Sequence, residues 1–181
     1  APQVWAWRSS RIAQMRRNIR ELLCIFPFEP EFFAKHDMPA TYIGHPLTRL
    51  VKPSHTRDEF LRKHRIPANR PVVTLLPGSR PGEISRHLPI LARTAEIMNR
   101  RQAASFLLAT PAGLISRLGA SFFKEPIGTA PIQHIEGETW DAIAHADMAL
   151  AASGTVTVEA ALLGTPMIAY YKVNPLSWWM G

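Results

Sequence analysis

The stretch VVTLLPGSRPGEIS, residues 72–85, decides the fold of this chain. Its first five residues are apolar or β-branched without interruption, which predicts a strand buried on both faces, as in a parallel sheet. Pro77 and Gly78 end that strand, and the following segment, Ser85 to Arg101, is predicted to be a helix. A buried strand, a glycine-containing loop and a helix in this order form the first part of a βαβ unit.

The same alternation continues along the rest of the chain. Further strands are expected at residues 105–109, 132–135, 148–151 and 167–171, separated by helices at 111–124, 139–145 and 156–163. Parallel strands need helix-sized, right-handed connections, so the sequence predicts an α/β fold with a doubly wound, Rossmann-like parallel sheet. Ligands of such sheets bind beyond the carboxyl ends of the strands, which directs attention to the loops found there.

The first third of the chain is less regular. We expect short strands at 4–7, 22–26 and 42–43, a helix at 31–36, a linker at 47–56 and a helix at 57–65. An amphipathic basic helix is predicted from Ser10 onward, with an apolar face made by Ile12, Met15, Ile19 and Leu22. The change of pattern places one domain at residues 1–52 and a second at 53–181.

Composition limits the class of protein. The chain has 181 residues, 46% hydrophobic and 19% charged, which excludes a disordered or collagen-like chain. The net charge of +7 predicts attraction to phosphates, nucleic acid or an acidic membrane. The single cysteine, Cys24, cannot form an intrachain disulfide, and no run of 18 apolar residues could span a bilayer.

The loop after the 72–76 strand reads as a phosphate-binding loop. Gly78 allows backbone N–H groups to approach a ligand, Ser79 adds a hydroxyl, and Arg80 has a planar charged group suited to phosphate oxygens. It is neither a Walker A loop nor a G-x-G-x-x-G loop. The alternative is an ordinary strand-to-helix turn with a solvated arginine. Glu83 is expected to fix Arg80 in place.

A second candidate loop follows the 148–151 strand. Ser153, Gly154 and Thr155 open a helix there, where unpaired N–H groups and the helix dipole favour an anion. Glu159, one turn further on, could accept hydrogen bonds from the hydroxyls of a ribose. Together the two loops predict a nucleoside-diphosphate site. The alternative is that Ser153 or Thr155 merely caps the helix and that Glu159 is solvated.

These loops belong to a wider set of motifs that resembles the lipid-A-disaccharide synthases. The set comprises PQVWAWR (2–8), FPFE (26–29), GHPL (44–47), LLPGSR (75–80) with Glu83 and Ile84, ASGT (152–155) with Glu159, TPM (165–167) and AYYK (169–172). The resemblance covers essentially the whole chain and implies a GT-B glycosyltransferase: most of a donor domain preceded by the end of an acceptor domain.

The resemblance also implies a reaction. Enzymes of this family transfer a sugar from UDP-2,3-diacylglucosamine to 2,3-diacylglucosamine 1-phosphate and release UDP, without a metal or other cofactor. Arg80 is then the catalytic candidate, and the donor UDP contacts are Gly78, Ser79, Arg80, Ser153, Gly154, Thr155 and Glu159. The family's general base and the segments of its homodimer are expected outside this chain, which resembles a central fragment. We therefore expect weak UDP binding and no turnover by the isolated chain.

Membrane contact is expected because both substrates carry acyl chains. The candidates combine positive charge with interfacial aromatic rings, and they are Arg8, Arg11, Arg16, Arg17, Arg20, Trp178 and Trp179. The expected location is cytoplasmic, peripheral on the inner membrane of a Gram-negative bacterium, the organism class being implied by the resemblance alone. The alternative is a solvated basic face, with tryptophans that pack against other parts of the protein.

Two other readings stay open. The chain could belong to another GT-B enzyme that uses a UDP-sugar, such as an N-acetylglucosaminyltransferase or an epimerase, or it could be a non-catalytic basic module that binds a membrane. Nucleic acid is not expected as a partner, because no helix-turn-helix, RRM or zinc-finger pattern occurs and the arginines are not interleaved with stacking aromatic residues. His45 could be a base or a structural turn residue, and His87, His134 and His145 lack metal-ligand spacing and have no predicted role.

Overall fold

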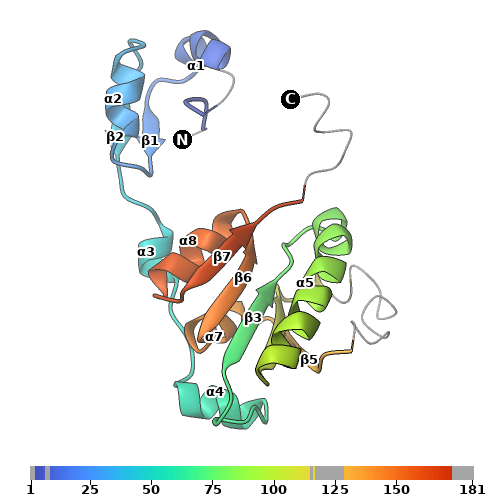
Figure 1. Cartoon of the computed structure of the whole chain (residues 1–181). Coiled ribbons are helices and arrows are strands. Elements are labelled where there is room, and N and C mark those ends of the chain that lie inside the picture. The colour runs from blue at the N-terminus through green and yellow to red at the C-terminus, as the bar shows by residue number, and fades with distance from the viewer. Residues whose placement is uncertain (1–2, 7–8, 115, 117–128, 173–181) are drawn as a thin grey trace. The chain divides into compact units, whose positions relative to one another are not determined.

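The computed structural model describes residues 3–6, 9–114, 116 and 129–172. The chain divides into two compact units, residues 1–50 and 51–181, which we call the small unit and the large unit and describe separately (Figure 1). The predicted domain limit between residues 52 and 53 lies two residues from this division. The assignment of the units to acceptor and donor domains stays a prediction.

The small unit is built around a two-stranded parallel sheet. Its elements are a 3-10 turn at Ser9–Arg11, α1 (Ile12–Asn18), β1 (Leu22–Cys24), α2 (Glu29–Ala34), β2 (Ala40–Tyr42) and α3 (Leu47–Leu50). Leu22 pairs with Ala40 and Cys24 with Tyr42 across the sheet. The core of this unit is small and apolar, made by Val4, Ile12, Leu22, Cys24, Phe33 and Met38.

Several predictions for the small unit are wrong in detail. Val4 to Ala6 form a turn instead of a strand, and Trp7 lies outside the described residues. Helix α1 ends at Asn18, because Ile19 is already extended and the chain turns into β1. The predicted linker at 47–56 contains α3, whose first amide, that of Leu47, donates to the imidazole Nδ1 of His45.

The strand predicted at 22–26 ends two residues early for a specific reason. The carboxylate of Glu29, fully buried, accepts the backbone N–H groups of Ile25 and Phe26, each at 3.0 Å. Its other oxygen accepts the indole N–H of Trp5 at 3.1 Å. The amides that would continue the strand are therefore used by a side chain.

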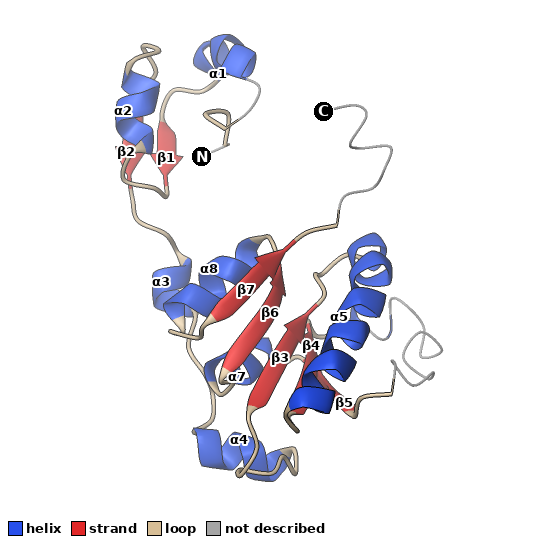
Figure 2. Ribbon diagram, in the orientation of Figure 1, coloured by secondary structure: helices blue, strands red, loops and turns tan. Residues whose placement is uncertain are grey.

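The large unit contains a parallel sheet of five strands in the order β5-β4-β3-β6-β7 (Figure 2). The elements, in chain order, are α4 (Arg57–Lys63), β3 (Val72–Leu76), α5 (Pro81–Arg101), β4 (Ser105–Thr110), β5 (Ile132–Glu136), α7 (Thr139–Ala144), β6 (Met148–Ala152), α8 (Thr155–Leu162) and β7 (Met167–Tyr170). All five predicted strands are confirmed, and so is the Rossmann-like fold. The helix predicted at 111–124 lies largely outside the described residues.

Helices cover both faces of this sheet because the central strands are apolar on both faces. Val73 and Leu75 of β3 pack with residues of α5, whereas Val72 and Leu76 pack with residues of α4, α7 and α8. Helix α5 begins at Pro81, four residues before the predicted start, since proline is favoured in the first turn and Glu83 follows there. No helix among the described residues is long and apolar enough to cross a membrane.

The strand order determines where a ligand can bind. The chain adds β4 and β5 on one side of β3, then crosses back to add β6 and β7 on the other side. The connections from β3 and from β6 therefore leave the sheet in opposite directions, which opens a crevice between their carboxyl ends.

Candidate functional site

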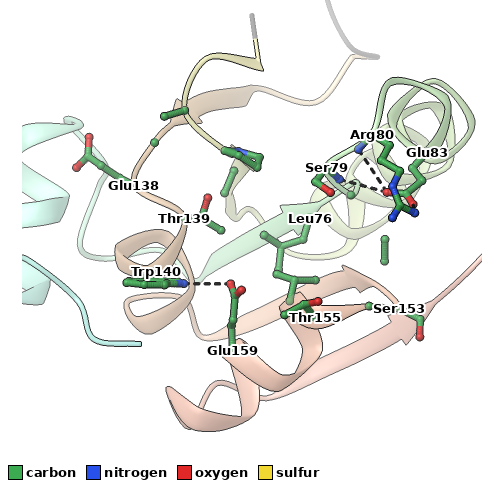
Figure 3. A pocket seen from close by; sticks show the side chains of 18 of the residues that line it. Leu76, Ser79, Arg80, Glu83, Glu138, Thr139, Trp140, Ser153, Thr155 and Glu159 are labelled. Carbon is green, nitrogen blue, oxygen red and sulfur yellow. Dashed lines mark hydrogen bonds and ion pairs between the residues drawn. The ribbon is translucent and has the colours of Figure 1, made fainter. Parts of the chain in front are cut away.

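A cavity of about 620 Å³ lies at the carboxyl ends of the strands in the large unit (Figure 3). A cavity of this size is in the range of small-molecule sites. Its walls come from the loops after β3, β4, β5, β6 and β7, and the residues that matter below are Gly78, Ser79, Arg80, Glu83, Glu138, Trp140, Ser153, Gly154, Thr155, Glu159 and Tyr171. All seven residues predicted to contact UDP therefore line one cavity, although they come from two loops more than 70 positions apart.

The loop after β3 is organised by Glu83. Its Oε1 lies 3.2 Å from the guanidinium of Arg80, and its Oε2 accepts the backbone N–H groups of Ser79 at 3.3 Å and Arg80 at 3.4 Å. Figure 3 shows the Arg80 and Glu83 side chains together at the start of α5. Glu83 thus holds Arg80, as expected, while 81% of the Arg80 side chain stays exposed and able to meet a ligand.

The second loop presents the start of α8. Gly154 is the N-cap residue, and no side chain caps this helix end, so neither Ser153 nor Thr155 plays the capping role of the alternative reading. The amides of the first turn of a helix lack the usual acceptors four residues earlier and can serve an anion, although that of Thr157 already donates to the Gly154 carbonyl at 3.1 Å. The amide of Ser153 is used otherwise, because it donates to the carbonyl of Tyr170 at 2.7 Å.

Glu159 is held by a residue that the sequence reasoning missed. The indole Nε1–H of Trp140 donates to Glu159 Oε2 at 3.1 Å, and both side chains line the cavity (Figure 3). Glu159 is therefore not simply solvated. A tryptophan in the first turn of the helix after β5 was an available signal, because an indole N–H usually finds an acceptor.

The loop after β5 is fixed by a cluster of charges that the sequence also did not reveal. Glu138 Oε2 accepts from Lys63 Nζ at 2.9 Å and lies 3.3 Å from His64 Nε2, both on or next to α4. Burial opposes ionisation of Glu138, but the hydrogen bonds from Lys63 and His64 outweigh it and lower the pKa. The buried Asp141 accepts the backbone N–H groups of Ser54 at 2.9 Å and His55 at 2.7 Å.

The residues predicted to contact a membrane belong to a different part of the chain. Arg11, Arg16, Arg17 and Arg20 are exposed in the small unit, where Arg16 forms an ion pair with Asp37 at 3.3 Å. Arg8, Trp178 and Trp179 lie outside the described residues. His45 accepts the Leu47 amide and lies beside the ring of Phe26, a structural arrangement at the start of α3. Within the described ranges no cluster of three metal-ligating side chains occurs.

The fold and the cavity define a class of protein. The large unit has the parallel Rossmann-like sheet of the GT-B glycosyltransferase fold, with a cavity lined by two loops at neighbouring strand ends. Among solved structures, the chain is similar to Anabaena Alr3699/HepE in complex with UDP and glucose, with a TM-score of 0.51 and 18% identity over 89% of this chain and 47% of that chain. At this identity the likeness concerns the fold.

The family is shown by sequence. The chain belongs to the lipid-A-disaccharide synthetase family, whose family model matches residues 1–181. It is 58% identical to the lipid-A-disaccharide synthase of Solibacter usitatus and 38% identical to that of Syntrophus aciditrophicus, in both cases over 100% of this chain. It spans 46% and 47% of those relatives, so about half the length of each.

Proposed function

We propose that the protein carrying this chain transfers a diacylglucosaminyl group from UDP-2,3-diacylglucosamine to 2,3-diacylglucosamine 1-phosphate, which yields the β-1,6-linked disaccharide 1-phosphate and UDP. The observation that carries this proposal is the convergence of Arg80, the start of α8 and Glu159 on one cavity in a member of this family. The large unit is then the donor domain and the small unit the end of the acceptor domain.

Each part of the cavity has a role in this proposal. Arg80 and the amides at the start of α8 bind the diphosphate, and Glu159 accepts hydrogen bonds from the ribose hydroxyls. When the glycosidic bond to UDP breaks, negative charge grows on the departing phosphate, and oriented cations and dipoles stabilise such charge. Arg80 is therefore proposed as the catalytic residue of this half of the site, with no metal or cofactor assigned a role.

Titration of the 181-residue chain with UDP, followed by the ³¹P NMR signals of the ligand, tests the donor site. We expect weak binding by the wild type and at least about tenfold weaker binding by Arg80→Ala, because hydrogen bonds between charged groups contribute about 1.5–3 kcal/mol. The matched control is Arg93→Ala, which removes an exposed arginine of the same helix that pairs with Glu96 and does not line the cavity. Absence of UDP binding by the wild type, or equal binding by Arg80→Ala, would contradict the proposal.

We also propose that the protein contacts the inner membrane from the cytoplasmic side. The support is the group of exposed arginines in the small unit, together with substrates whose acyl chains lie in a bilayer. The homodimer and the Gram-negative source that the resemblance implies are part of the same proposal.

A further inference from the structure

His87 is a completely buried histidine on α5 that does not line the cavity. Its Nδ1 lies 2.9 Å from the carbonyl oxygen of Pro77. Pro77 begins the loop after β3, residues 77–80, which we call the Arg80 loop. Its Nε2 accepts the backbone N–H of Lys172 at 3.2 Å, just after β7. One imidazole therefore joins Pro77 and Lys172, which are 95 positions apart along the chain.

These two hydrogen-bond partners determine which ring nitrogen of His87 carries the hydrogen. A carbonyl oxygen can only accept, so Nδ1 carries the hydrogen, and an N–H group can only donate, so Nε2 carries a lone pair. His87 is thus neutral, in the Nδ1–H form. In an imidazolium, Nε2 would also carry a hydrogen. Two N–H groups would then face each other, and the hydrogen bond from the Lys172 amide would be lost.

The connection extends to the other anion-binding loop. The amide of Ser153 donates to the carbonyl of Tyr170 at 2.7 Å, two residues before Lys172. The rings of Tyr170 and Tyr171 also pack edge-on against the His87 imidazole, with centroids 5.2 and 5.3 Å away. Hydrogen bonds thus run from the Arg80 loop through His87 to the end of β7, and from there to the start of α8.

The strand order shows why such a connection matters. Strand β6 lies between β3 and β7, so no ladder hydrogen bond joins β3 to β7 directly. The loop after β3 also extends beyond the last residue that pairs with β6, Leu76. The separation between Arg80 and the start of α8 is therefore not set by the sheet alone, and a diphosphate must contact both.

We propose that His87 is a positioning residue of the donor site: its neutral imidazole holds the Arg80 loop at the distance from the start of α8 that a diphosphate requires. The inference rests on the proposed UDP site. His87 does not touch the ligand, and its effect passes through the Pro77 carbonyl and the Lys172 amide.

Two substitutions break the connection at opposite ends. In His87→Asn the amide group can still donate to Pro77 but does not reach Lys172, and in His87→Gln the longer side chain can accept from Lys172 but does not keep the Pro77 bond. The matched control is Leu91→Ala, one turn further on the same buried face of α5, which lowers stability without affecting either loop.

The 181-residue chain and these variants are titrated with UDP and with uridine, and unfolding is followed separately in urea. We expect both His87 variants to bind UDP about tenfold more weakly, uridine binding to be unchanged, and Leu91→Ala to bind UDP as the wild type does. If His87 only supported the core, all three variants would be less stable, but the folded variants would bind UDP as tightly as the wild type does. That result would overturn the inference.

A measurement on the wild type keeps the inference testable if the variants do not fold. Long-range ¹H–¹⁵N spectra of the histidine rings should show His87 in the neutral Nδ1–H form at neutral pH, and an Nε2–H or doubly protonated ring would overturn the inference. Failure of the wild type to bind UDP would reject the proposed donor site. Normal UDP binding by His87→Asn and His87→Gln would reject the role of His87 alone.

Discussion

Gly78 shows how a single residue shapes the loop after β3. Its φ of +110° is a conformation that side-chain-bearing residues rarely adopt, and a Cβ built there would lie 2.7 Å from Glu83 Oε2. That oxygen is the acceptor for the amides of Ser79 and Arg80. Glycine at this position therefore makes room for the carboxylate that organises the loop.

We accordingly expect Gly78→Ala to destabilise the chain by about 1–3 kcal/mol, because of both backbone strain and displacement of Glu83. Urea denaturation measures the effect. Gly82→Ala is the control: this glycine lies inside α5, its added Cβ would come no closer than 3.6 Å to Arg86, and alanine is the better helix former by up to about 1 kcal/mol. If both variants change stability in the same direction, the account of Gly78 is wrong.

The pair formed by Trp140 and Glu159 leads to a prediction about the sugar of the nucleotide. If Glu159 accepts hydrogen bonds from the ribose, the wild type should prefer UDP to 2′-deoxy-UDP, and Glu159→Gln should lose most of this preference. Trp140→Phe removes the N–H that orients the carboxylate, so it should reduce the preference to a smaller extent.

The measurement is the ratio of the two dissociation constants for each variant, with a change of about three- to tenfold expected in Glu159→Gln. Thr157→Ala serves as the control on the same helix, because the Thr157 hydroxyl donates to the carbonyl of Gly154 and the side chain does not line the cavity. An unchanged ratio in Glu159→Gln would show that the ribose does not contact this carboxylate.

At the scale of elements, the contact between α4 and the loop after β5 makes stability depend on pH. Lys63 and His64 lower the pKa of Glu138 below the ordinary value of 4.5, against the effect of burial. The folded state therefore favours the charged form. The stabilisation is complete above pH 4.5 and is lost as the pH falls through the lower pKa of the folded chain.

Glu138→Gln should therefore lower the free energy of unfolding by about 1 kcal/mol at neutral pH, and this difference should shrink in acid. Urea denaturation of both proteins at a series of pH values gives the comparison. Lys63→Met, which removes the closest partner of Glu138, should reduce the same acid-dependent component. A difference between wild type and Glu138→Gln that stays constant with pH would contradict the assignment.

The elements themselves were predictable to very different degrees. The central strands β3, β4 and β6 are mainly apolar and almost entirely buried, and burial on both faces leaves a strong local pattern. The edge strands β5 and β7 were also located, although they are only partly buried. In the small unit, β1 and β2 have three residues each, and side chains such as Glu29 and His45 bond the adjoining backbone. Such contacts between side chain and backbone produce no periodic pattern of apolar residues in the sequence, so the ends of these elements could not be predicted.

At the scale of the whole molecule, the net charge of +7 is the property to test. If the small unit contacts an anionic membrane, Arg16→Glu with Arg17→Glu should weaken binding to vesicles of anionic phospholipid more than tenfold, since each basic residue near such a surface contributes about 1 kcal/mol. Liposome flotation provides the measurement.

Arg100→Glu with Arg101→Glu is the matched control, because it changes the net charge equally with two exposed arginines at the end of α5. We expect the control to retain most of the binding. Equal losses in both variants would mean that overall charge, and not the surface of the small unit, attracts the membrane.

The sequence by itself determined the alternation of strands and helices, the family, and the residue types of the loops after β3 and β6, because each of these depends on residues that are close together in the sequence. Only the tertiary structure decided which distant residues meet: Trp140 with Glu159, Ser54 with Asp141, and His87 with Lys172. The first and the last of these pairs depend on the parallel sheet and its strand order, which bring the carboxyl ends of β3, β5, β6 and β7 to one edge. That order results from packing of the whole unit, and no local pattern of residues specifies it.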